Sequence, residues 1–113
     1  MYVFQVPETK LDAFLRVQKG AEAIYKQYGA LDDETLAPVD LSAKYGCAAF
    51  TGVGGAGDGE RLYVGVSRFR DRAHHDEVMT QVDNDERIAE LYTKMLGIID
   101  MGRILRGEFE RVD

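Results

Sequence analysis

The spacing of apolar residues changes once within the first thirty positions, and this change constrains the fold more than any other feature of the chain. Tyr2, Phe4 and Val6 alternate with their neighbours at the two-residue period of a β-strand. From position 11 the spacing becomes three or four, the period of an amphipathic helix, through Leu11, Phe14, Val17, Ala21, Ile24 and Tyr28. We therefore expect a strand over residues 2–6 followed by a helix over about residues 9–28.

Polar and glycine residues at the ends of this helix predict where it begins and stops. Thr9 and Asp12 are three residues apart, as in a capping box, where two side chains satisfy free backbone N–H groups. Gly29 follows the last apolar residue and suits a helix end.

The remaining segments give a less even pattern. Residues 31–39 predict a strand with several acids, and residues 40–50 fit either a short helix or an irregular segment. The later elements expected are a strand over 61–69, a helix over 71–82 capped by Asp71, a helix closed by Gly97 with Asp83 and Glu86 as its cap, and a strand over about 103–112.

This order of elements predicts an α+β, ferredoxin-like βαββαβ fold with a four-stranded antiparallel sheet and helices on one face. Both sides of the 61–69 strand are apolar. We assign Leu62, Val64 and Val66 to the helices, and the alternating side with Tyr63, Gly65, Ser67 and Phe69 to the open face. Because a large open apolar face usually marks an interface, we expect a homodimer with its sheets packed face to face. The alternative is that an extra helix or residues 40–59 fold over that face.

Length and composition favour one ordinary domain. The chain has 113 residues, which we take as a single domain spanning 1–113, with 45% hydrophobic and 30% charged residues. Cys47 is the one cysteine, and we expect it to be a small buried residue rather than a nucleophile. With no membrane-length apolar run and no leader pattern, the expected location is the cytoplasm.

The charge balance bears on the choice of partner. Fourteen Lys and Arg against twenty Asp and Glu give a formal net charge of −6. Nucleic-acid affinity depends on neutralising phosphates, so we expect no nucleic-acid binding.

The glycine-rich run TGVGGAGDGE contains a literal G-x-G-x-x-G match at Gly52, Gly54 and Gly57. In the dinucleotide fingerprint a helix must follow these glycines, with its N-terminus facing the pyrophosphate. Here two acids and a strand follow, so we interpret the run as a mobile loop. No cofactor is predicted from it.

His74, His75, Asp76 and Glu77 are the one local concentration of titratable groups with catalytic potential. Adjacent histidines on a helix point about 100° apart, so they do not readily grip one metal ion, and no metal site is predicted. A histidine here could act as a general base oriented by a carboxylate. The structural alternative is that both are solvated or bonded to a neighbouring loop.

The chain resembles the YbaA-like family of uncharacterised bacterial proteins in the dimeric α/β-barrel superfamily. The family's S-R-A-H-R-D-E-V segment corresponds to DRAHHDEV at 71–78, and its F-D-x-K-R-M-x-x-G-G-F-E ending is similar to residues 99–110. The MYV opening and the Tyr-Gly-Ala-Leu run at 28–31 also fit. The resemblance implies a ferredoxin-like protomer in a dimer whose sheets face each other. It implies no activity, although superfamily relatives include cofactor-free monooxygenases, haem-degrading enzymes and ligand-sensing domains.

The two segments that best match the family supply the candidate site. We expect His74 to be the proton-transfer candidate, with Arg72, Asp76, Asp100 and Arg103 binding a small anionic ligand, if the helix start at 72 and the strand start at 103 lie together. The leading hypothesis is a homodimeric small-molecule-binding protein or cofactor-independent enzyme. The alternative is a non-catalytic regulatory or protein-interaction domain that acts through its dimer surface.

Overall fold

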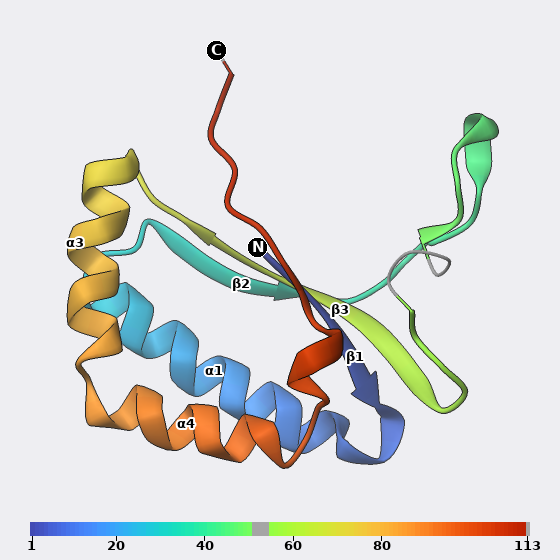
Figure 1. The fold of residues 1–113 in the computed structure, drawn as a ribbon, viewed down its shortest axis with the longest axis horizontal. Helices are drawn as coiled ribbons and strands as arrows, with labels where there is room; N and C mark the ends of the chain where they lie inside the picture. Colours follow the sequence, from blue (N-terminus) through green and yellow to red (C-terminus); the bar gives the residue numbers. More distant parts are fainter. Residues whose placement is uncertain (51–54, 113) are drawn as a thin grey trace.

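A four-stranded antiparallel sheet with helices on one face forms the body of the protein in a computed structural model that describes residues 1–50 and 55–112 (Figure 1). The strands are β1 (Tyr2–Pro7), β2 (Asp32–Leu36), β3 (Glu60–Arg68) and β4 (Leu105–Arg106), in the sheet order β2-β3-β1-β4. The helices are α1 (Leu11–Gln27), α3 (Arg72–Asp83) and α4 (Glu86–Leu96), with 3-10 turns η1 (Glu8–Lys10), η2 (Lys44–Gly46) and η3 (Met101–Arg103). This order and sheet topology confirm the predicted α+β ferredoxin-like fold.

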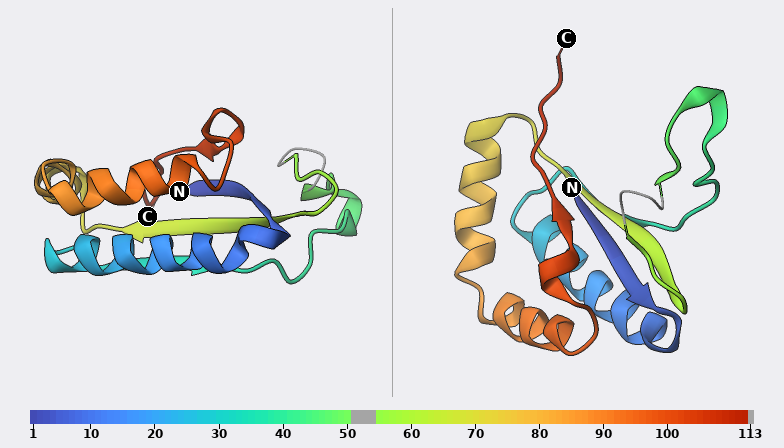
Figure 2. Two further views of the ribbon diagram at one scale, coloured as in Figure 1. Left: turned by 90° about the horizontal axis from the view of Figure 1, so that it is seen from below. Right: turned by 45° about the vertical axis from the view of Figure 1, so that its right-hand side comes forward.

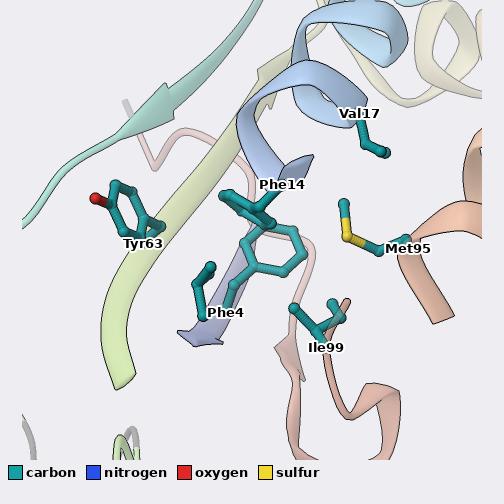
Figure 3. Close-up of a cluster of buried hydrophobic side chains, with 7 residues drawn as sticks. Phe4, Phe14, Val17, Tyr63, Met95 and Ile99 are labelled. Carbon is teal, nitrogen blue, oxygen red and sulfur yellow. The ribbon is translucent and has the colours of Figure 1, made fainter. Parts of the chain in front are cut away.

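The main core lies between the sheet and helices α1 and α4 (Figure 3). Its buried residues come from both layers: Phe4, Val6, Phe14, Val17, Tyr63, Met95 and Ile99. Phe14 of α1 is fully buried, and its ring centroid lies 5.1 Å from that of Phe4 and 5.7 Å from that of Tyr63. These aromatic contacts hold α1 against β1 and β3.

A second cluster joins α3 to the other end of α1. Ala30, Val78 and Val82 are buried there, and Phe69 packs against them. The two clusters together cover the helix-facing side of the sheet, which we call the inner face.

The inner face carries the aromatic and small residues of β3, so our assignment of the two sides of this strand is wrong. Phe4 pairs with Tyr63 and Tyr2 pairs with Gly65, which places these residues on the same side as Phe14. A Cβ at Gly65 would lie 3.1 Å from the Phe4 ring, so glycine leaves the space that the ring occupies. The branched residues Leu62, Val64 and Val66 therefore lie on the opposite side, the outer face.

Two of the predicted helix caps also differ. Helix α1 follows the η1 turn, and its N-cap, Lys10, makes no side-chain capping bond, so the Thr9–Asp12 box does not form. Helix α4 is capped by Asp85, which accepts a hydrogen bond from the Arg87 backbone N–H, rather than by Asp83. The predicted cap of α3 is confirmed, because Asp71 accepts from the backbone N–H of His74 at 2.8 Å.

Residues 37–50 form a largely irregular arm that projects from the sheet and contains the short η2 turn (Figure 2). The arm exposes Val39 and Tyr45 almost completely, and the segment after β4 exposes Phe109 and Val112. The radius of gyration is 15.0 Å, against about 13 Å for a compact domain of this length. The last strand is two residues long instead of about ten, and the first glycines of the predicted mobile loop, Gly52 and Gly54, lie outside the described residues.

Candidate functional site

Basic side chains from two distant segments converge beside the first turn of α3. Arg72 belongs to that turn, and Arg106 belongs to β4, where it pairs with Tyr2 of β1. Both guanidinium groups bind the carboxylate of Glu108, which follows β4. We call Arg72, His75, Arg106 and Glu108 the clamp.

Each oxygen of Glu108 has its own arginine. Arg72 Nη1 donates to Oε1 at 2.6 Å, and Arg106 Nη2 donates to Oε2 at 2.5 Å. These bonds lower the pKa of Glu108 to about 2, and the bond from Arg72 makes the largest contribution. Glu108 therefore stays ionised across the physiological range.

His75 completes the clamp. Its Nε2 lies 3.6 Å from Glu108 Oε1, while its Nδ1 lies 2.9 Å from Asp76 Oδ1 and 3.3 Å from Arg72 Nη1. Nδ1 can either accept from Arg72, which only donates, or donate to the Asp76 carboxylate, which only accepts. The contact with Asp76 is the shorter one, so it favours a proton on Nδ1 that is donated to Asp76. The ring also meets Phe69 edge-on at 4.9 Å, which fixes its orientation.

His74 has a different environment from its neighbour. It is buried, and its Nδ1 accepts a hydrogen bond from the Arg70 backbone N–H at 3.0 Å. In the neutral ring the proton is then on Nε2. This bond ties the turn after β3 to α3, which is the structural alternative considered for this pair of histidines.

Arg103 and Asp100 lie away from the clamp, so the expected meeting of the two segments at 72 and 103 is not found. Arg103 binds both carboxylate oxygens of Glu60, at 2.9 and 3.0 Å, and donates to the Gly55 carbonyl at 2.6 Å. Asp100 accepts from the Gly102 N–H within the η3 turn. Glu60 begins β3, whereas Arg72 follows its end, a separation of roughly 26 Å along a nine-residue strand.

A polar strip on the inner face lies close to the clamp. Ser67 donates to Asp33 Oδ1 at 2.7 Å, and Gln18 of α1 donates to Thr35 at 3.0 Å. Burial raises the pKa of Asp33, which its bond from Ser67 only partly offsets. Burial also raises the pKa of Tyr25, with the nearby Tyr2 and Asp33 adding to it. Such groups are uncommon between a sheet and its helices and could recognise a polar ligand group.

Two open hollows lie elsewhere on the surface. One of about 430 Å³ lies between α1 and α4, beside Arg16, Leu91 and Lys94. The other, of about 250 Å³, lies on the outer face, where the arm residues Leu41 and Phe50 meet Leu62 and Val64. The second hollow is mostly apolar and continues the outer face.

Three further observations concern Cys47, metal binding and membrane-spanning helices. Cys47 is exposed, not buried as expected, because it lies on the projecting arm. Across residues 1–50 and 55–112, no group of three or more His, Cys, Asp and Glu is placed to hold a metal ion. No helix in the same ranges is long and apolar enough to cross a membrane.

Of the four clamp residues, sequence reasoning missed Arg106 and Glu108, and it chose His74 in place of its neighbour His75. The R-G-E run at 106–108 was the available signal, since its arginine and glutamate share one side of an extended strand. No curated protein matches the chain. A family model described as "Protein of unknown function (DUF1428)" matches residues 1–99, which include α3 and its His-His pair but not Arg106 or Glu108. The chain therefore belongs to this DUF1428 family.

Proposed function

We propose that the protein is a homodimeric small-molecule-binding domain whose ligand carries a negative charge and binds at the clamp. The observation that carries this proposal is the convergence of Arg72, Arg106 and His75 on one carboxylate. Arginine forks match the oxygens of an anion and suit them better than lysine does. Among the described residues, only one nitrogen of each guanidinium is bonded to Glu108, so both keep further donors.

The proposed site differs from the set expected from the sequence. It keeps Arg72 and Asp76 and takes His75 in place of His74, whose Nδ1 is bonded to the backbone. Asp100 and Arg103 are left out, since both are engaged at the other end of β3. If the protein is an enzyme, His75 is the proton-transfer candidate, because its Nε2 lies beside the Glu108 carboxylate, the position that the ligand would take.

Thermal-shift measurements with phosphate, citrate and benzoate test the proposal, with benzamide as a neutral control. A ligand at 100 times its dissociation constant stabilises a protein by about 2.7 kcal/mol, a shift on the order of 10 °C here. We expect Arg72→Gln to lose the shift and Arg70→Gln, a matched loss of charge two residues away, to keep it. If no anion stabilises the wild type, the proposal fails.

A second candidate is the non-catalytic interaction domain, and the projecting arm favours it. Large apolar residues are exposed on the arm and beyond β4, and both segments flank the outer face (Figure 1). Leu36 and Leu105 are exposed on that face, where Leu36 pairs with Val64 and Leu105 pairs with Val3. A second copy of the chain would cover these side chains, with the sheets packed face to face.

Adjacent residues of β3 provide a matched test of the dimer. Val64→Asp places a charge on the outer face and should give a folded monomer. Tyr63→Asp places the same charge in the core and should unfold the protomer. Light scattering and circular dichroism separate these results. A wild-type protein that is monomeric at high concentration would overturn the proposed dimer, whether or not the protein binds an anion.

A further inference from the structure

We infer that Glu108 is a built-in occupant of a carboxylate-binding site, which accepts a small carboxylate with an aromatic or apolar body in its place. The inference rests on the proposed function and adds the ligand class and a competitor from the chain itself. Arg72 and Arg106 approach different oxygens of Glu108, from α3 and from β4. A carboxylate has two oxygens, so each arginine can donate to one of them. A phosphate would bring further oxygens for which these two arginine bonds provide no donor.

Glu108 is held by its side chain rather than by regular structure. The strand pairing of β4 ends at Arg106, and Gly107 then makes two backbone hydrogen bonds with Met1. Among the described residues that follow, Phe109 and Val112 are largely exposed and pack into no core. The segment can therefore leave the clamp by breaking the Glu108 bonds, and an incoming carboxylate would restore the same bonds.

Aromatic surfaces flank the two cations. The Arg106 guanidinium lies over the Tyr2 ring, 5.9 Å from its centroid, and Tyr2 stacks on Phe4. On the other side, Phe69 meets the His75 ring. A ligand body entering with its carboxylate would meet the half-buried rings of Tyr2 and Phe69, which favours an aromatic or apolar body over a polar one.

Calorimetric titration with sodium benzoate tests the inference on the full chain. Glu108→Gln removes the competing charge, and Glu110→Gln removes the same charge two residues away. A charge-assisted hydrogen bond is worth about 1.5–3 kcal/mol, so we expect Glu108→Gln to bind benzoate about tenfold tighter than the wild type. Glu110→Gln should change the affinity less than twofold. Equal or weaker binding by Glu108→Gln would overturn the inference.

Carboxyl-carbon NMR of wild-type Glu108 adds a direct readout. Saturating benzoate should return the pKa of Glu108 from about 2 toward its ordinary value, because both arginines leave it. An unchanged pKa with benzoate bound would show that Glu108 stays in the clamp and would overturn the inference. If inorganic phosphate gains as much affinity as benzoate in Glu108→Gln, the ligand class is wrong.

The two failures are distinguishable. If neither the wild type nor Glu108→Gln binds any anion, the proposed function fails together with this inference. If the wild type binds benzoate through Arg72 but Glu108→Gln gives no gain, the proposed function stands and Glu108 is not a competitor.

Discussion

An arginine–glutamate cluster lies beside each end of β3, and the two clusters differ in how many cations share the carboxylate. At the Glu60 end, one arginine faces one carboxylate, and Nη2 of Arg103 also donates to the Gly55 carbonyl. At the other end, two arginines and a histidine share Glu108. The first cluster is a brace between the η3 turn and the start of β3, in which one arginine makes three hydrogen bonds. In the second, two arginines share one carboxylate, and each gives it one hydrogen bond.

Exposure alone does not distinguish a structural ion pair from the anion site that we propose. Arg103 and Arg72 are both substantially exposed, at 40% and 60% of their side chains. What differs is the number of cations that share the carboxylate and whether its backbone is held in place. Glu60 begins a paired strand and also accepts a hydrogen bond from the Gly57 N–H, while Glu108 lies beyond the end of β4.

The largest expected effect is on anion binding. Arg106→Gln should weaken benzoate binding about tenfold or more, because one charge-assisted bond to the ligand is lost. Arg103→Gln removes the same charge at the brace and should change the affinity less than twofold. Calorimetric titration of both variants checks this, and a comparable loss in Arg103→Gln would abolish the distinction between the clusters.

The next effect concerns local opening at the brace. Arg103→Gln should speed amide hydrogen exchange of the turn over residues 57–60 severalfold, since the turn loses the contact that closes it. Arg72→Gln should leave exchange in that turn unchanged. Exchange rates that respond equally to both substitutions would mean that the two ends are coupled.

A smaller effect is predicted for acid stability. The pKa of Glu108 is about 2 in the folded state and ordinarily 4.5. A lowered folded pKa contributes stability above pH 4.5 that is lost as the pH falls toward 2. Glu108→Gln should therefore flatten the decline in urea midpoint between pH 4.5 and pH 2. An identical decline in the variant would show that Glu108 is not held by the clamp in solution.

The smallest effect has the opposite sign. Burial raises the folded pKa of Asp33 above 3.8, so its protonated form is favoured on folding, and stability falls as the pH rises through the raised pKa. Asp33→Asn should remove this fall and make the protein slightly more stable at pH 7 than the wild type. Urea denaturation at pH 3.5 and pH 7 measures it, and a variant less stable at pH 7 would contradict the assignment.

Local sequence patterns predicted the helices and the sheet well, but not which side of β3 is covered. Both sides of β3 are apolar, so a period of two cannot say which one the helices pack against. The answer depends on the register with β1, which places Gly65 where the Phe4 ring needs space. A similar limit applies to the caps, because Asp83 and Asp85 both precede α4. The residue at which the helix begins decides which of them is the cap, and α4 begins directly after Asp85.

The candidate site was predicted in part. Arg72 and Asp76 are in or beside the clamp, because both lie on the first turns of a helix whose start was well marked by Asp71. The choice between His74 and His75 depends on the rotation of that helix against Phe69, which the spacing of apolar residues does not determine closely enough. Alternation in an extended segment places Arg106 and Glu108 on one side, but it does not show that this side meets the first turn of α3.

The most direct test of the clamp is a crystal structure of the Glu108→Gln protein with benzoate. We expect the benzoate carboxylate to lie between Arg72 and Arg106, with one oxygen toward each guanidinium and the ring beside Tyr2 or Phe69. We also expect the segment after Gly107 to have moved away. Benzoate bound elsewhere, or both arginines still bonded to the substituted side chain at saturating benzoate, would contradict these expectations.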